Sequence, residues 1–420
     1  MDQGNTAFLL ISAALVLLMT PGLAFFYGGL VKAKSVISMM MLSFGAMGLI
    51  GVLWVIYGYA IAFPGAEGLV PPWSIDWSAI GLSSLLETPE GAAYPPLAFV
   101  GFQATFAIIT VALISGAIAD RAKFGAWMIF AGLWATIVYF PVASWVFNFG
   151  LAEDGSFAYG GWITYGMQEF FGVGALDFAG GTAVHINAGA AALALALVLG
   201  KRVGFSKGAH VPHNPPFVLL GAGLLWFGWF GFNAGSELAA DGTAAVAWIN
   251  TLAAPAAALL AWLVVEKIKD GKPTSIGAAS GAVAGLVAIT PACAFLTPIW
   301  AIVLGVVAGA VCALAIDLKF KWGFDDSLDV VGIHLVGGLI GTLYLGFFAN
   351  GTGLIYSGNL TQLLVQAIAA VAVLLYSFVL AWVIGFAIQK TIGFRVKNED
   401  EIAGIDTVVH GEEGYKLETV

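Results

Sequence analysis

The chain has 420 residues, of which 60% are hydrophobic and only 10% charged, and its mean hydropathy is +0.94. A soluble domain usually carries about a quarter charged residues, so this composition excludes an ordinary soluble fold. The net charge is −9, and we expect no nucleic-acid partner. These values predict an all-α polytopic membrane protein.

Apolar windows long enough to cross about 30 Å of hydrocarbon recur along the whole chain. We predict about eleven transmembrane helices, near residues 6–31, 39–63, 96–119, 124–149, 179–200, 216–236, 242–265, 275–295, 297–318, 328–349 and 361–389. The first window follows a start without a basic region or a cleavage motif, so we interpret it as a retained span and not as a signal peptide.

The basic residues predict the orientation of these spans. With the N-terminus outside and the C-terminus inside, all 16 Lys and Arg residues fall in inner segments, as the positive-inside rule requires. The outer segments then carry acids and no base. An acidic outer face concentrates cations, although the same pattern also follows from topology alone.

The predicted spans divide the chain into repeats. Residues 1–390 form a transmembrane domain, with one five-helix repeat at about 6–200, an inverted second repeat at about 216–349 and a last span at about 361–389. Two long segments, about 64–95 and 150–177, would form a structured outer rim. Residues 391–420 form a polar cytoplasmic tail.

Two matching aspartate-to-histidine spacings stand in the two repeats. The segment DFAGGTAVHINAG runs from Asp177 to His185 and beyond, and DSLDVVGIHLVGG runs from Asp326 to His334. Eight helical residues rise about 12 Å, so an inverted repeat brings both histidines near the bilayer midplane from opposite sides. We interpret the aspartates as helix N-caps, that is, as structural acids.

A buried histidine in a membrane span must pair, line a cavity or do chemistry. Two separately satisfied core histidines and a bis-histidine haem site are the alternatives to a pair that lines a pore. Cys293 and Cys312 lack metal-ligand spacing and are interpreted as buried hydrophobic residues. No nucleophile triad or metal cluster stands out, so we expect no enzyme activity, no cofactor and no metal.

Further motifs surround these histidines. They are FYGGL from Phe26, AFVGFQATFAIITV from Ala98, WFGFNAGS from Trp229 and SGAVAGLVAITPACA from Ser280. With the two histidine segments they closely resemble the ammonium transporter family, of the bacterial or archaeal Amt type related to Rh proteins. The resemblance covers the chain from about residue 6 to the tail. It implies eleven spans, a homotrimer with one pore per subunit, and conduction of ammonium or ammonia, with methylammonium as a related substrate.

The resemblance implies roles for individual residues. His185 and His334 match the twin histidines of the pore, and Phe106 and Phe232 match a stacked phenylalanine gate. Other matched residues belong to outer ammonium recruitment (Phe102 and Ser236) or lie beside the pore (Trp229, Thr290 and Ser280).

The chain departs from the family pattern at one vestibule position, where bacterial members usually have tryptophan. Here the sequence reads ASWVFNFG, which places Phe147 at the position and Trp145 two residues earlier. Two residues turn a helical side chain by about 200°, so we expect Phe147 to complete the vestibule. Its ring offers a weaker cation–π face than an indole.

The residue types suit the expected chemistry. Aromatic rings and a hydroxyl attract an ammonium ion and accept one N–H bond, and an apolar throat penalises any ion that stays charged. Beyond the throat, two imidazoles can donate to and accept from ammonia and can carry a proton. Our hypothesis is therefore recruitment of ammonium, deprotonation near Phe106 and Phe232, and transfer past His185 and His334.

The tail and inner loops indicate partners at the cytoplasmic face of a cell membrane. His210 and His213 lie in a basic loop, where a solvated role is expected. The tail residues Gly393, Arg395, Gly404, Asp406 and Gly411 resemble the family's regulatory C-terminus, which implies docking of PII-type signalling proteins. The alternative functions are an Rh-like channel for ammonia or carbon dioxide and an ammonium sensor that does not conduct.

Overall fold

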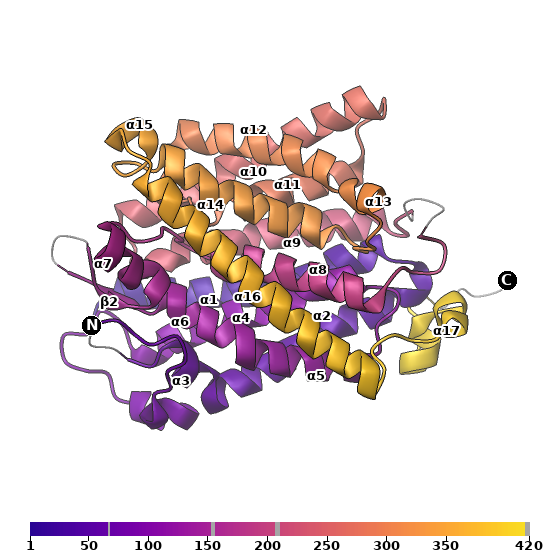
Figure 1. Ribbon diagram of the computed structural model, residues 1–420, viewed down its shortest axis with the longest axis horizontal. Coiled ribbons are helices and arrows are strands. Elements are labelled where there is room, and N and C mark those ends of the chain that lie inside the picture. Colours follow the sequence, from indigo (N-terminus) through magenta and orange to yellow (C-terminus); the bar gives the residue numbers. More distant parts are fainter. Residues whose placement is uncertain (66–67, 153–155, 206–210, 416–420) are drawn as a thin grey trace.

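A computed structural model describes the chain except for residues 66–67, 153–155, 206–210 and 416–420. His210 therefore lies outside the described residues. The described part is a bundle of long helices that run roughly side by side (Figure 1). The prediction of an all-α polytopic membrane protein is confirmed.

Within the described residues, ten helical segments are long and apolar enough to cross a membrane. They comprise α1 (Gln3–Leu30); η1 (Ala33–Ser35), α2 (Val36–Leu53), η2 (Trp54–Gly58) and α3 (Tyr59–Ala62); α4 (Pro96–Ile114) and η4 (Ser115–Ile118); α5 (Phe124–Trp134), η5 (Ala135–Tyr139) and α6 (Phe140–Phe147); η7 (Gly181–Ile186) and α8 (Asn187–Leu199); α9 (Pro215–Ala234) and η9 (Gly235–Glu237); α10 (Gly242–Lys269); α12 (Pro298–Ala315) and α13 (Leu318–Trp322); η10 (Val331–Leu335) and α14 (Val336–Phe348); and α16 (Thr361–Thr391).

The eleventh predicted window, 275–295, forms a shorter helix. Here α11 (Ser275–Ile289) has 15 residues and ends in turns that continue to Phe295. At 1.5 Å per residue the helix alone spans about 22 Å, which is less than the hydrocarbon thickness. Ten windows are therefore spans by length and composition, and one is a short apolar helix inside the bundle.

The remaining elements lie between the spans and after the last one. They are η3 (Trp77–Leu85), β1 (Phe149–Leu151), β2 (Phe157–Gly160), η6 (Trp162–Gly166), α7 (Met167–Phe171), α15 (Leu354–Ser357), α17 (Asn398–Ala403) and η11 (Asp406–His410). Strands β1 and β2 pair antiparallel. The N-terminus, α7, β2 and α15 lie at one end of the bundle, and α17 lies at the other (Figure 1).

The helices of the two predicted repeats pack in corresponding pairs. Helix α1 packs against α2 and α4, and α9 packs against α10 and α11 in the same way. The two sets meet along α1 and α9, where Gly221 lets the backbone of α9 approach Phe26 of α1 so closely that a Cβ would overlap it. Small residues allow this close approach in lipid, where no hydrophobic force drives helices together.

Candidate functional site

The two histidine segments cross at the centre of the bundle. Helix α14 packs against η7, and α8 packs against η10, so each histidine segment contacts the helix that continues the other. Gly189 of α8 makes this crossing possible, because a Cβ there would lie 2.6 Å from the backbone nitrogen of Leu335. Close helix crossing therefore depends on a residue without a side chain.

His185 and His334 meet at this crossing. Their rings stack with centroids 5.4 Å apart, and the two Nδ1 atoms lie 3.3 Å from each other. Both side chains are buried, with exposed fractions of 1% and 3%. Each histidine lies on a π-helical segment, η7 or η10. Such segments are rare and recur at functional sites, because the wider turn frees a side chain from the regular helical face.

The aspartates that precede the histidines cap these segments. The Asp177 carboxylate accepts from the backbone N–H groups of residues 180–183 and from the Thr182 hydroxyl. Asp326 accepts from the N–H groups of Val330 and Val331, at 3.1 and 2.7 Å. The caps satisfy backbone donors that the helix start leaves free. They orient the histidine segments and do not contact the imidazoles.

Hydrogen bonds around Thr290 assign the tautomers of the histidine pair. The Thr290 hydroxyl donates to the Leu286 carbonyl (2.8 Å) and accepts from the Trp229 indole N–H (2.9 Å). His185 Nε2 lies 3.3 Å from the same oxygen, whose one proton is already used, so Nε2 is the donor. The Nδ1 atom of a neutral His185 then accepts from His334 Nδ1–H, which leaves His334 Nε2 as an acceptor.

Phe106 and Phe232 form a stacked pair next to His185. Their centroids lie 4.2 Å apart with an interplanar angle of 26°, and both rings are buried. The Phe232 ring also lies 6.2 Å from the His185 ring. The phenylalanine pair and the histidine pair are therefore neighbours in one continuous stack.

A cavity of about 340 Å³, which we call the outer cavity after the orientation predicted from the sequence, reaches Phe106. Phe147 and Ser236 line it, whereas Trp145 points elsewhere and donates to the Pro72 carbonyl at 2.9 Å. Phe102 is fully buried, with its ring centroid 4.9 Å from that of Phe106, and it is not among the lining residues. Phe102 therefore supports the Phe106 ring from behind.

A much smaller cavity, of about 10 Å³, touches the histidines. It is lined by apolar side chains together with Trp229, Phe232 and both imidazoles. This volume is about that of a single water-sized probe. Ser280 lies buried on α11, three residues before Val283, which lines this cavity. Only a molecule as small as water or ammonia fits here.

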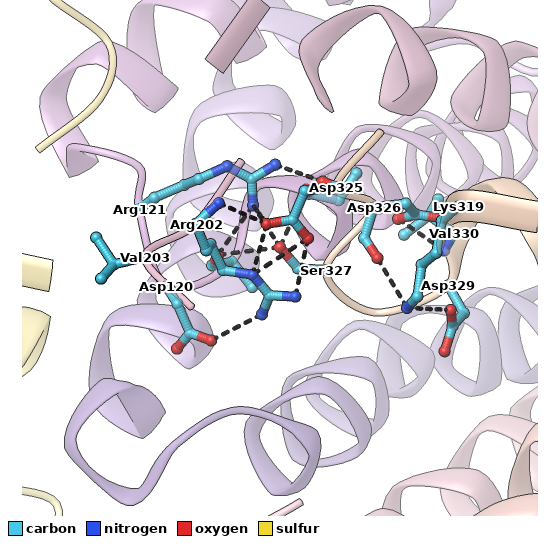
Figure 2. A network of polar contacts seen from close by, with 12 residues as sticks. Asp120, Arg121, Arg202, Val203, Lys319, Asp325, Asp326, Ser327, Asp329 and Val330 are labelled. Carbon is cyan, nitrogen blue, oxygen red and sulfur yellow. Dashed lines mark hydrogen bonds and ion pairs between the residues drawn. The ribbon is translucent and has the colours of Figure 1, made fainter. Parts of the chain in front are cut away.

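A cavity of about 310 Å³, which we call the inner cavity after the same predicted orientation, is lined in part by Arg202, Lys319 and Asp329, which belong to a network of charges. The Asp325 carboxylate accepts hydrogen bonds from the backbone N–H and the guanidinium of Arg202, which also pairs with Asp120 at 3.1 Å (Figure 2). Arg121 donates to the Asp325 carbonyl and to Ser327. Burial favours a raised pKa for Asp325, but hydrogen bonds from Arg202 and the charge of Arg121 outweigh it and lower the pKa.

At Asp326 the effect of burial on the pKa is not outweighed. It raises the pKa of this carboxyl to about 6, with the charge of Asp329 adding to the rise and Lys319 opposing it. The unfolded value is about 3.9, so the folded protein binds more protons between about pH 4 and 6. The stability contributed by Asp326 is full below that interval and is lost as the pH rises through it.

We therefore expect Asp326→Asn to gain thermal stability relative to the wild type as the pH rises from about 4 to 7. Unfolding of the detergent-solubilised proteins, followed by intrinsic tryptophan fluorescence, measures this difference. Parallel pH profiles for the two proteins would contradict the expectation.

The tail is bound to the helix ends near α17 (Figure 1). Glu401 accepts from the Val203 N–H (2.6 Å) and pairs with Arg395 (2.8 Å). Asp406 accepts from the N–H groups of Ile37 and Ser38, at the first turn of α2. Burial raises the pKa of Asp406, and these two bonds oppose the rise. The tail therefore supplies the cap that α2 lacks locally.

His213 takes part in the same attachment. Its Nδ1 lies 2.7 Å from the Val31 carbonyl and its Nε2 lies 2.8 Å from the Tyr415 hydroxyl. The side chain is half-buried. The expectation of a solvated loop histidine is wrong, because the tail folds back over the loop and bonds to the ring.

Several residues of the outer cavity were not predicted from the sequence. Gln103 and Asn148 line it, and each has a buried amide atom without a partner among the described residues. Tyr59, Tyr94 and Tyr159 add an aromatic rim. Their signal was weak, because single amides and tyrosines are common at the ends of membrane helices.

Fold and site together define a polytopic helical membrane protein. Its centre holds a stack of two phenylalanines and two histidines, between a wide outer cavity and a wide inner cavity. Sequence comparison identifies the family. The profile of the Ammonium Transporter Family matches residues 7–415, and the chain belongs to this family.

Relatives and solved structures agree with this membership. The chain is 53% identical to an ammonium transporter of Mycobacterium tuberculosis, over 99% of this chain and 90% of the relative. It is 42% identical to the ammonium transporter Amt1 of Archaeoglobus fulgidus, over 99% and 100%. The crystal structure of Candida albicans Mep2 is similar with a TM-score of 0.84, 30% identity and coverage of 95% and 88%. A protein described as a sensor Amt protein is similar with a TM-score of 0.86, 27% identity and coverage of 97% and 98%.

Proposed function

We propose that this protein moves ammonium or ammonia across a cell membrane through the stack of Phe106, Phe232, His185 and His334. The observation that carries the proposal is the cavity of about 10 Å³ between wide cavities on either side. It has room for one small molecule, and two imidazoles supply its polar lining. A hydrated ion does not fit, whereas ammonia does.

The outer cavity recruits the cation in this proposal. Phe147 and Ser236 line it beside Phe106. The Ser236 hydroxyl donates to the Phe232 carbonyl at 2.8 Å, so its lone pairs stay available to accept an N–H bond. Ammonium differs from potassium by donating hydrogen bonds, and the Ser236 hydroxyl can accept one of them.

The phenylalanine stack then removes water. The rings of Phe106 and Phe232 have no polar atom that could replace the water bound to a cation. A bare charge in such an apolar place is costly. Ammonium can avoid this cost by losing a proton, which potassium cannot do. The neutral molecule next meets the histidine pair.

The histidine pair completes the path. With the tautomers assigned above, the shared Nδ1 proton links the rings, and His334 Nε2 accepts an N–H of ammonia. Trp229 and Thr290 hold His185 in this orientation. Inward transfer of the proton needs the opposite tautomers: His185 Nε2 accepts the proton that ammonium loses, the shared Nδ1 proton moves to His334, and His334 Nε2–H releases its proton on the other side. A switch of both rings between these two states would make transport electrogenic.

We also propose the orientation of the bundle, the division of the chain and its assembly. The end of the bundle with α7 and α15 faces outside, and α17 faces the cytoplasm; residues 1–390 form the transport domain and 391–420 the regulatory tail. We propose a homotrimer with one pore per subunit. The docked tail, held through Glu401, Asp406 and Tyr415, is the surface on which a PII-type protein would act.

We expect proteoliposomes of the purified protein on a solid-supported membrane to give a transient current after an ammonium pulse and none after an equal potassium pulse. Only ammonium can give up a proton at the stack, and the current requires that this proton also crosses through the histidine pair. Ammonia-driven alkalinisation of the lumen without any current would favour an Rh-like electroneutral channel.

A sensor is the second candidate, because a sensor Amt protein has a similar fold. The same experiment separates it from a transporter. If the protein bound ammonium but gave neither a current nor a change of lumenal pH, we would conclude that it is a sensor and not a transporter.

A further inference from the structure

The wall of the cavity of about 10 Å³ beside the histidines is formed mostly by apolar side chains. Two helices, α1 and α9, contribute three residues each, at the spacing that places side chains on one helical face. These residues are Met19, Leu23 and Phe26 of α1 and Leu225, Trp229 and Phe232 of α9. The size of the cavity therefore depends on how the side chains of these two helices pack.

Met19 differs from the other apolar side chains of this wall. Methionine is unbranched and has three side-chain torsions, so it adapts to irregular spaces, whereas leucine, isoleucine and valine are branched and phenylalanine has a rigid ring. Met19 is the only methionine among the described lining residues, and it is 1% exposed. It is therefore the wall residue that can change its shape with the smallest shift of the backbone.

Gly228 of α9 makes room for the Met19 side chain. A Cβ at position 228 would overlap Cγ of Met19 and would lie 2.6 Å from the Leu15 carbonyl oxygen. The Met19 side chain thus lies directly against the α9 backbone, one residue before Trp229, which also lines the cavity. Met19 therefore reaches from the contact between α1 and α9 to the cavity that the histidines line.

The volume of the cavity limits the size of the amine that can pass. A cavity of about 10 Å³ holds about one water-sized molecule, and ammonia is of that size. Methylamine carries one more methyl group, and a close-packed interior has no space for it unless a wall atom moves. An unbranched side chain can move its end aside, which a branched side chain of similar volume cannot do as easily.

We propose that Met19 is the residue that sets the largest amine the pore admits. Its thioether end completes the wall when ammonia occupies the cavity, and it turns aside for the methyl group of methylamine. This inference rests on the transport function proposed above, because the amine must pass the histidine pair. Met19 determines specificity in this account, and it neither holds the substrate nor moves its proton.

Two variants of Met19 should shift this specificity in opposite directions. Met19→Leu nearly conserves the side-chain volume but has a branch at Cγ, so methylammonium uptake should fall about fivefold relative to ammonium uptake. Met19→Ala removes Cγ, Sδ and Cε, so the same ratio should rise about fivefold. Initial uptake of isotope-labelled ammonium and methylammonium into proteoliposomes, each added alone at the same pH, measures the ratio.

Met39→Ala is the matched control, because Met39 is 2% exposed on α2 and is not among the described residues that line the cavity. Its uptake ratio should equal that of the wild type. The wild-type ratio in both Met19 variants, a shift opposite to the one expected, or an equal shift in Met39→Ala would each overturn the inference. Met19→Leu keeps the test valid if Met19→Ala does not fold.

The two proposals fail in different ways in this experiment. Normal ammonium uptake with unchanged ratios would refute only the role of Met19. Absence of ammonium uptake by the wild type would refute the proposed function, and the role of Met19 with it.

Discussion

Replacing His185 and His334 together by alanine is expected to abolish selective uptake. In the assigned tautomers the pair supplies one hydrogen bond to a desolvated molecule, through His334 Nε2, worth about 1–1.5 kcal/mol. Its loss raises the barrier by about 1–1.5 kcal/mol, which slows uptake roughly 5- to 13-fold. Uptake of labelled methylammonium into proteoliposomes measures this change.

The same variant should also lose its preference for ammonium over potassium. Two alanines remove the imidazole groups from the cavity of about 10 Å³, so the site no longer offers ammonia a hydrogen bond that an ion cannot use. The control is His213→Ala, the same substitution at a histidine of the inner loop, which should leave the uptake rate within about twofold of the wild type, because a loss of about 0.4 kcal/mol or less is expected away from the pore. Wild-type selectivity in the double variant would refute the proposed role of the histidines.

Replacing Asp325 by alanine is expected to cause the largest loss of stability. Asp325 is fully buried and pairs with Arg202, and its carbonyl accepts from Arg121, which is also fully buried (Figure 2). Removing one partner of a buried ion pair leaves a charge without compensation and costs about 3–5 kcal/mol. Burial already lowers the pKa of Arg121 to about 10, with Asp325 opposing, so this guanidinium depends on the carboxylate.

The loss of stability is measured by heating each protein and determining by size-exclusion chromatography how much remains folded. The matched control is Asp317→Ala, which breaks an exposed pair with Lys269 whose side chains are 46% and 40% exposed. Exposed pairs contribute about 0–1 kcal/mol, so this control should unfold close to the wild type. Equal loss in both variants would show that the buried network does not stabilise the inner face.

Parts of the site could be predicted because local rules determine them. The spacing of Asp177 and His185 places a cap and a buried ring on one helix, and the matching pair in the second repeat does the same. Helical phase separated Phe147 from Trp145, and the structure places Phe147 on the outer cavity and Trp145 away from it. In each case the residues that matter are close in the sequence.

Other parts could not be predicted, because they depend on segments that meet only in the fold. Phe102 packs between Phe106 and Gly235 of η9, two residues far apart in the sequence from each other. His213 meets Tyr415 only because the tail returns to the loop before α9. The tautomer assignment needs Thr290 of the second repeat beside His185 of the first.

The sequence alone determined the class of protein, the number of apolar windows and the histidine pair, because hydrocarbon thickness and the cost of buried charge act on every segment by itself. The tertiary structure decided which side chains line each cavity, how large the cavities are and which buried oxygens lack partners. Those properties arise where helices from different parts of the chain pack together. Distances between such helices cannot be derived from the order of the amino acids. The clearest example is Gln362, whose side chain donates to the carbonyl of Gly174 in a distant part of the chain.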